Sequence, residues 1–167
     1  MADTPLQREL RQKRPFRSPA QASALGLLRT ADLITRSLAR TIEPHGITLQ
    51  QYNVLRILRG AMPEPMATLA IGERMIEQTP GITRLLDRLE AKGLIVRNRC
   101  KADRRQVHCH ITPSGLALLE ALDEPVHVIE EQLMAPLGRA DQKALIALLD
   151  RIRSARPDPA PDHSSSD

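Results

Sequence analysis

The densest group of side chains that could hold a polyanion lies between residues 97 and 105. Within this stretch a single acidic residue faces five basic ones, which are Arg97, Arg99, Lys101, Arg104 and Arg105. Guanidinium and ammonium groups at this density attract phosphate, so nucleic acid is the favoured partner. The alternative is a charged face that is merely exposed to solvent. The secondary structure predicted around the cluster has to distinguish nucleic-acid binding from this alternative.

A second group of polar side chains precedes this cluster. Thr79 followed by Pro80 is typical of a helix start. Apolar residues then recur every three or four positions up to Gly93, at Ile82, Leu85, Leu86 and Leu89. The outward side carries hydroxyl and guanidinium groups that could contact bases or phosphates in a major groove, namely Thr79, Thr83, Arg84 and Arg88.

Two details of this helix leave alternatives open. Gln78 and Thr79 lie where free amides at the helix start could meet phosphate. Arg84 could instead pair with a neighbour such as Asp87 and merely solvate the helix. The helix before it, expected over residues 68–76, completes a helix-turn-helix pattern.

The scaffold predicted for these side chains is mainly helical. Helices are expected over residues 20–43, from 48 to a break at 60–65, 68–76, 79–92, 113–133 and 139–153. Thr48 and Gln51 form a capping box, and Ile47 can pack as a staple onto Tyr52. In the 68–76 helix the inward residues are expected to be Leu69, Ile71, Met75 and Ile76. Pro125 is expected to kink or divide the helix over residues 113–133.

After Gly93 the hydrophobic period changes from helical to two residues. Leu94 and Val96 alternate with their neighbours, and so do Val107, Cys109 and Ile111. The pattern predicts one small β-hairpin whose tip carries the basic cluster, a wing.

Cysteines and histidines in the hairpin could support redox or metal chemistry. Cys100 and Cys109 flank its tip on opposite strands, which leaves a redox pair open, although the inward position of Cys109 favours a small buried side chain. His108 and His110 share one strand face. No third ligand stands at a convincing spacing, so we expect no metal site.

Composition excludes several classes of protein. Aromatic residues are 1% of the 167 residues, so the stacking surfaces of RNA-recognition and single-strand-binding folds cannot be built. No run approaches the about 18 apolar residues that span a bilayer, and the start MADTPLQREL lacks the apolar core of a secretion signal, so we expect a cytoplasmic protein without a membrane partner. Phosphate-loop, nucleophile-elbow and zinc-protease motifs are missing, so we expect neither an enzyme nor a cofactor.

The two ends differ in composition from the middle of the chain. Residues 1–19 mix prolines with basic and polar residues, and residues 154–167 are rich in Pro, Ser and Asp. We expect a flexible basic N-terminal segment, one domain over residues 20–153 and a disordered C-terminal tail.

The motifs occur in a specific order in residues 79–119, TPGITRLLDRLEAKGLIVRNRCKADRRQVHCHITPSGLALL. A helix is followed by the hinge AKGL, a wing with a D-x-R signature and a threonine that opens the next helix. In this order the chain resembles MarR-type regulators, the multiple-antibiotic-resistance regulator family, over about residues 20–153. The resemblance implies a winged helix-turn-helix over residues 48–112, flanked by dimerisation helices over residues 20–47 and 113–153.

This resemblance also implies partners and roles. It implies a homodimer that binds a pseudo-palindromic operator in double-stranded DNA, most often as a repressor, with half-sites about 10 base pairs apart. Arg105 would enter the minor groove while Asp103 orients the wing. The remaining cations of the wing, Arg99, Lys101 and Arg104, would touch phosphate. Pro80 and Gly81 depart from the usual start of the reading helix, and Gly72 weakens the helix before it, which leaves base preference open.

An effector site is implied at the junction of the first two long helices. Family pockets for small aromatic or anionic effectors are drawn from the region of His45, Tyr52 and Arg56, although Tyr52 also suits the staple described above. Binding there would change the spacing of the two lobes and release DNA. The alternatives are a redox-responsive regulator that uses Cys100 and Cys109, and a helical protein-interaction adaptor.

Overall fold

Helix α2 (Pro19–Ile42) begins and ends where local chemistry allows. The Ser18 side chain accepts a hydrogen bond from the Gln21 amide at 3.2 Å, and the proline that follows gives up no donor that the first turn needs. The helix runs on into the 3-10 turn η1 (Glu43–His45), and Gly46 ends it with a left-handed φ of 79°. The first long helix is therefore confirmed.

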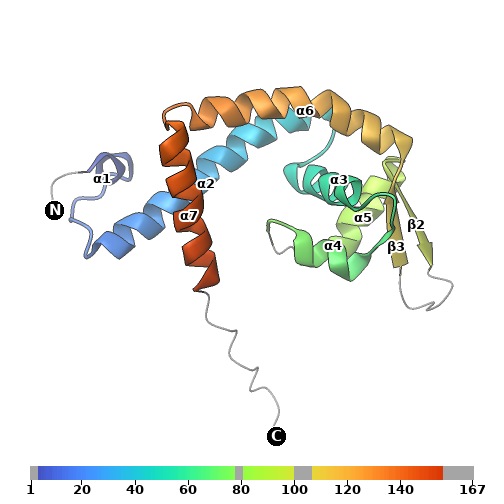
Figure 1. Ribbon diagram of the computed structural model, residues 1–167, viewed down its shortest axis with the longest axis horizontal. Helices are drawn as coiled ribbons and strands as arrows, with labels where there is room; N and C mark the ends of the chain where they lie inside the picture. The colour runs from blue at the N-terminus through green and yellow to red at the C-terminus, as the bar shows by residue number, and fades with distance from the viewer. Residues whose placement is uncertain (1–3, 78–80, 100–106, 156–167) are drawn as a thin grey trace, which may run out of the picture. The chain divides into compact units, whose positions relative to one another are not determined.

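The computed structural model describes residues 4–77, 81–99 and 107–155 (Figure 1). The other elements are, in chain order, α1 (Pro5–Glu9), α3 (Leu49–Ala61), β1 (Met66–Ala67), α4 (Thr68–Arg74), α5 (Ile82–Ala91), β2 (Ile95–Arg99), β3 (Val107–Ile111), α6 (Pro113–Met134) and α7 (Arg139–Ser154). The mainly helical fold with a small hairpin is confirmed. The chain divides into two compact units, residues 1–129 and residues 130–167.

The sheet of the first unit has the strand order β1-β3-β2, with both neighbouring pairs antiparallel. In the predicted hairpin, Ile95 lies opposite Ile111 and Arg99 opposite Val107. β1 adds a third strand that the sequence pattern does not predict, because two residues are too few to show an alternation. This strand joins the entrance of α4 to the wing.

The residues from α3 to β3 form a unit that we call the winged lobe, and it has its own core. Figure 1 shows α3, α4 and α5 gathered beside the strands. Side chains with no more than 1% exposure come from these helices, the sheet, α6 and the end of α2, and include Ile42, Leu55, Ile71, Leu86, Leu89, Ile95, Leu119 and Leu122. Burying each such side chain contributes about 1.5–3 kcal/mol before the cost of ordering it.

The start of α3 is built as its sequence predicts. The Gln51 amide donates to the Thr48 side chain at 3.2 Å, and the Thr48 amide donates to the Gln51 side chain at 3.1 Å. Ile47 and Tyr52, the expected staple pair, are both buried in the core of the lobe. This cap fixes the angle at which the chain enters the lobe.

The predicted inward face of the 68–76 helix is half wrong. Ile71 and Met75 are buried, but Leu69 is 74% exposed and Ile76 is 82% exposed. Residues 69 and 71 stand about 200° apart around a helix, so only one of them can face the core. Ile76 lies beyond the end of α4 at Arg74 and no longer follows the helical period.

The N-terminal segment differs from the flexible segment expected over residues 1–19. Thr4 caps the short helix α1, and Gln7 and Phe16 are buried. Arg29 of α2 donates to Glu9 at 2.7 Å, which ties α1 to the long helix. The apolar Phe16 and these polar contacts order a stretch that its composition alone did not distinguish from a tail.

The last two helices agree with their predicted ranges. α6 is continuous across Pro125, which therefore does not divide it. Leu122 and Val126 are buried on either side of the proline, and this packing offsets the hydrogen bond that the proline cannot donate. α7 ends at Ser154, and residues 156–167 of the expected tail lie outside the described residues. Among the described helices, none combines the length and apolar character needed to cross a membrane.

Candidate nucleic-acid interface

Helix α5 separates an apolar side from a charged side. Leu85, Leu86 and Leu89 are buried in the lobe. Four residues on the opposite side are exposed, namely Thr83, Arg84, Asp87 and Arg88. The predicted outward face is therefore present on this helix.

The described part of α5 starts directly after a glycine. The helix begins at Ile82 with Gly81 as its N-cap, at a left-handed φ of 109°. A glycine adopts this conformation without the penalty that a side chain brings, which lets the chain turn just before the helix. The predicted start at Thr79 and Pro80 lies outside the described residues, and so does Gln78.

Helix α3 holds the turn that leads into α5. The Asn53 side chain accepts a hydrogen bond from the Ile76 amide at 3.1 Å, and the Gln50 side chain donates to Glu77 at 3.2 Å. Met75 between these contacts is buried. The position of α5 thus depends on the first two turns of α3.

Arg97 of the wing is bound by two acids of α5. One of its terminal nitrogens lies 2.6 Å from Asp87 and 2.7 Å from Glu90, and its Nε donates to Glu90 at 2.9 Å. The Arg97 amide also donates to Glu90 at 3.0 Å. The Arg97 guanidinium lowers the pKa of the Glu90 carboxyl, chiefly through the hydrogen bond between the two side chains.

This bridge corrects two expectations. Arg97 was counted among the cations that face a polyanion, but its side chain is only 21% exposed and is engaged within the lobe. Asp87 pairs with Arg97 across the hairpin entrance and not with Arg84 on its own helix. Arg84 and Arg88 consequently make no ion pair with any residue that the structure describes.

The wing is attached to the lobe at both strands. Thr68 at the start of α4 donates to the Val107 carbonyl at 3.4 Å. Thr112 donates to the Gly93 carbonyl at 2.7 Å and accepts from the Gly115 amide at 3.1 Å, so it caps α6 as predicted. A Cβ on Gly115 would lie 2.4 Å from the Leu94 carbonyl oxygen, so only glycine fits there.

Of the predicted phosphate-binding cations in the wing, Arg99 lies at the exposed end of β2. The rest of the wing site is outside the described residues, namely Lys101, Asp103, Arg104 and Arg105. The structure therefore places Arg99 on the strand that leads to the tip.

The cysteines and histidines of the wing differ in accessibility. Cys109 is fully buried, and this burial raises the pKa of its thiol, which disfavours the reactive thiolate. Cys100 lies outside the described residues. His108 and His110 are partly exposed opposite Asn98 and Val96. Among the described residues no three His, Cys, Asp or Glu side chains are grouped to hold a metal ion.

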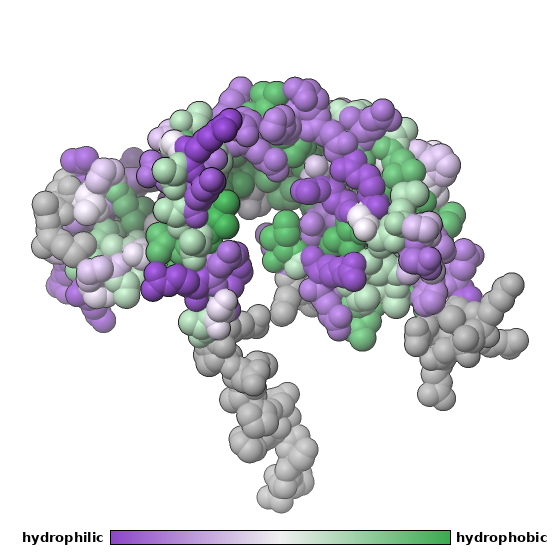
Figure 2. All heavy atoms as spheres, in the orientation of Figure 1, coloured by the Kyte–Doolittle hydropathy of each residue, from purple (hydrophilic) through white to green (hydrophobic). Residues whose placement is uncertain are grey.

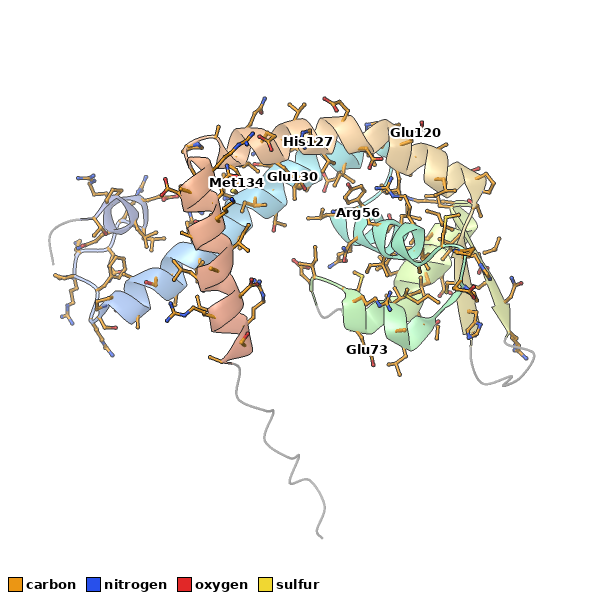
Figure 3. All side chains as sticks on the ribbon, viewed as in Figure 1. Arg56, Glu73, Glu120, His127, Glu130 and Met134 are labelled. Atoms are coloured by element: carbon orange, nitrogen blue, oxygen red, sulfur yellow. The ribbon has the colours of Figure 1, made fainter. Side chains whose placement is uncertain are left out.

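Two of the three predicted effector residues meet on α3. Figure 3 labels Arg56 on α3. Its guanidinium lies 5.8 Å from the centre of the buried Tyr52 ring, within cation–π range. One turn further on, Arg59 donates two hydrogen bonds to Asp123 of α6, at 2.8 and 2.9 Å. His45 is exposed on η1, outside this pair.

Comparison with known proteins finds one family. A family model described as the MarR family matches residues 47–107. The chain is similar to a MarR transcription factor from Planctomyces limnophilus, with 39% identity, 82% of this chain and 99% of that chain covered, and a TM-score of 0.64.

Two further solved structures are similar to this chain. A cysteine-to-serine mutant of MarR from E. coli, complexed with operator DNA, has 26% identity, 77% and 93% coverage and a TM-score of 0.69. BpsR from Bordetella bronchiseptica, a protein whose DNA binding is regulated by 6-hydroxynicotinic acid, has 25% identity, 79% and 98% coverage and a TM-score of 0.70.

Proposed function

We propose, from the premise that this chain belongs to the MarR family, that it represses transcription as a homodimer and that a small molecule releases it from its operator. The chain is a transcription regulator that binds double-stranded DNA. Its proposed mode of repression is occupation of a promoter so that polymerase is excluded.

One observation carries this proposal: the exposed side of α5 presents two arginines that form no ion pair with any other described residue. Arg84 and Arg88 stand one turn apart, and the acid between them, Asp87, is neutralised by Arg97. A helix of this kind fits a major groove, where a guanidinium can bind guanine with two hydrogen bonds.

The remaining site residues are assigned roles that fit a helix α5 lying in the major groove. We assign Thr83, Arg84 and Arg88 to base edges and nearby phosphates. Contacts to the backbone are assigned to Gln78, Thr79, Arg99, Lys101 and Arg104. Arg105 is assigned to the minor groove, with Asp103 holding the wing in place.

Dimerisation is proposed on the long helices. α2 exposes Leu28 and Leu33, and α7 exposes Ile146, Leu148 and Ile152, each by more than half. Figure 2 shows hydrophobic residues among hydrophilic ones on the visible face of α7. A second copy would cover such surfaces and would place two lobes on half-sites about one helical turn apart.

The proposed effector is a small aromatic anion. Arg56 over Tyr52 offers a cation beside an aromatic ring, and BpsR responds to an aromatic acid. With His45 close by in the chain, these residues form the proposed site. Because linkage is reciprocal, the effector must bind free protein more tightly than DNA-bound protein.

We further propose that the protein acts in the cytoplasm, together with the promoter DNA it binds, and that it has no catalytic activity. The motifs of known catalytic sites that were sought in the sequence are missing. Its action is therefore a binding equilibrium that a ligand shifts.

The test is selection of bound duplexes from a random pool, followed by footprinting on the selected operator. The expected consensus has two inverted half-sites centred about 10 base pairs apart. Arg105→Ala should then weaken binding and lower the salt dependence of affinity by about one counterion. Failure to enrich any sequence at low ionic strength would contradict the proposal.

A further inference from the structure

The bridge between the wing and α5 occupies most of what Arg97 could offer to DNA. Nε and one terminal nitrogen of its guanidinium are bound to carboxylates, and its amide is bound to Glu90. A phosphate contact would have to compete with two acids already within 2.7 Å of that terminal nitrogen. The geometry therefore assigns this cation to the protein's own structure.

The bridge also sets the charge of the helix that faces DNA. Without Arg97, the acids Asp87 and Glu90 would offset the two arginines on the same helix, Arg84 and Arg88. With Arg97 bound to both acids, the positive charge of the outward side dominates. This is a condition for approaching a phosphate backbone.

Finally, the bridge connects two elements that have to reach DNA together. Glu90 lies in the last turn of α5 and Arg97 in the middle of β2, on either side of the turn at Gly93. Gly93 itself adopts a left-handed φ of 68°. As a glycine it has no side chain whose contacts could fix the angle between α5 and β2. Binding residues are effective when supporting contacts hold them in the productive geometry.

We propose that Arg97 is a positioning residue for operator recognition: it sets the wing against α5 and neutralises Asp87 and Glu90, without contacting DNA. This inference rests on the proposed function. The rival reading is that Arg97 is one more phosphate-binding cation of the wing.

The first test is Glu90→Gln, because the two readings predict opposite signs. The substitution removes a negative charge near the DNA, so a purely electrostatic account predicts tighter binding. The positioning account predicts that operator affinity falls at least fivefold, while affinity for a scrambled duplex of equal length stays level or rises. Both affinities are measured by fluorescence anisotropy on the selected operator.

The second test compares Arg97→Gln with Arg99→Gln, a matched control two residues along the same strand. Arg99→Gln should weaken binding to both duplexes and lower the salt slope by about one. Arg97→Gln should cost at least tenfold on the operator and less than threefold on the scrambled duplex, with an unchanged salt slope. A structural defect alone would lower the fraction of active protein and leave the ratio between duplexes unmoved.

A double variant links the two residues. If Arg97 acts through Glu90, Arg97→Gln with Glu90→Gln should lose no more operator affinity than Arg97→Gln alone. Should Arg97→Gln fail to fold, as judged by circular dichroism, Glu90→Gln at the partly exposed Glu90 decides the question. Unchanged or tighter operator binding by Glu90→Gln would overturn the proposal, as would a salt slope lowered by Arg97→Gln. If the unsubstituted protein itself does not bind the operator, the proposed function is wrong.

Discussion

Helices α5 and α2 differ in how far their apolar residues are buried. α5 has 10 residues and buries three leucines in the winged lobe. α2 has 24 residues and buries only Ile42, while Leu28 is 68% exposed. α7, considered by itself, buries none of its 16 residues. The lobe thus buries its hydrophobic residues within one chain, whereas the long helices leave theirs exposed, where we propose that a second copy covers them.

The largest effect is expected from truncating a side chain in the core of the lobe. Leu86→Ala should lower the free energy of unfolding by about 2–5 kcal/mol, because Leu86 has 0% exposure and truncation leaves a cavity. Leu28→Ala on α2 is the matched control, and urea denaturation at fixed protein concentration measures both. Equal losses for the two variants would remove the contrast between the regions.

A charge introduced on the exposed side of α2 tests whether that surface forms the dimer interface. Leu28→Glu should weaken the dimer at least tenfold, since a carboxylate would be desolvated in the proposed interface. Sedimentation equilibrium measures the dissociation constant. Leu69→Glu in the lobe, where Leu69 is 74% exposed, should leave the dimer unchanged. A dimer that tolerates Leu28→Glu would place the interface elsewhere.

The smallest effect is expected where the lobe is tied to α6. Arg59 lowers the pKa of Asp123, so this stabilisation is complete above the unfolded-state pKa of about 4 and is lost as the pH falls through the folded value. The pair is half exposed, so its contribution is below about 1 kcal/mol. Asp123→Asn should destabilise slightly at pH 7, and the difference should vanish only once the pH falls below the folded-state pKa of Asp123, which is lower than about 4. A difference that persists in acid would contradict this account.

The sequence predicted the elements that depend on local signals. The capping box at Thr48, the apolar stripe of α5 and the alternation around Cys109 each involve residues within a few positions of one another. Periodicity and capping act over that range, so the helices and the hairpin could be predicted.

What the sequence did not predict depends on contacts between elements. Arg97 counts as one more cation in a basic cluster until the fold brings it to Asp87 and Glu90. The seven-residue spacing across the Gly93 turn was an available signal for that bridge. Leu69 and Ile76 were misplaced because α4 is too short for its period to be reliable. The ordering of the N-terminal residues likewise depends on a contact between elements, the ion pair of Glu9 with Arg29 of α2.

The exposed side of α5 is the centre of the account, and Arg88→Ala tests it most directly. Removing this exposed arginine should weaken operator binding by about 1–3 kcal/mol, since it eliminates either a base or a phosphate contact. Arg40→Ala, an exposed arginine of α2, serves as the control. The account predicts at least a fivefold rise in the operator Kd for Arg88→Ala and none for Arg40→Ala. Equal affinities for both variants would show that α5 does not contact the operator.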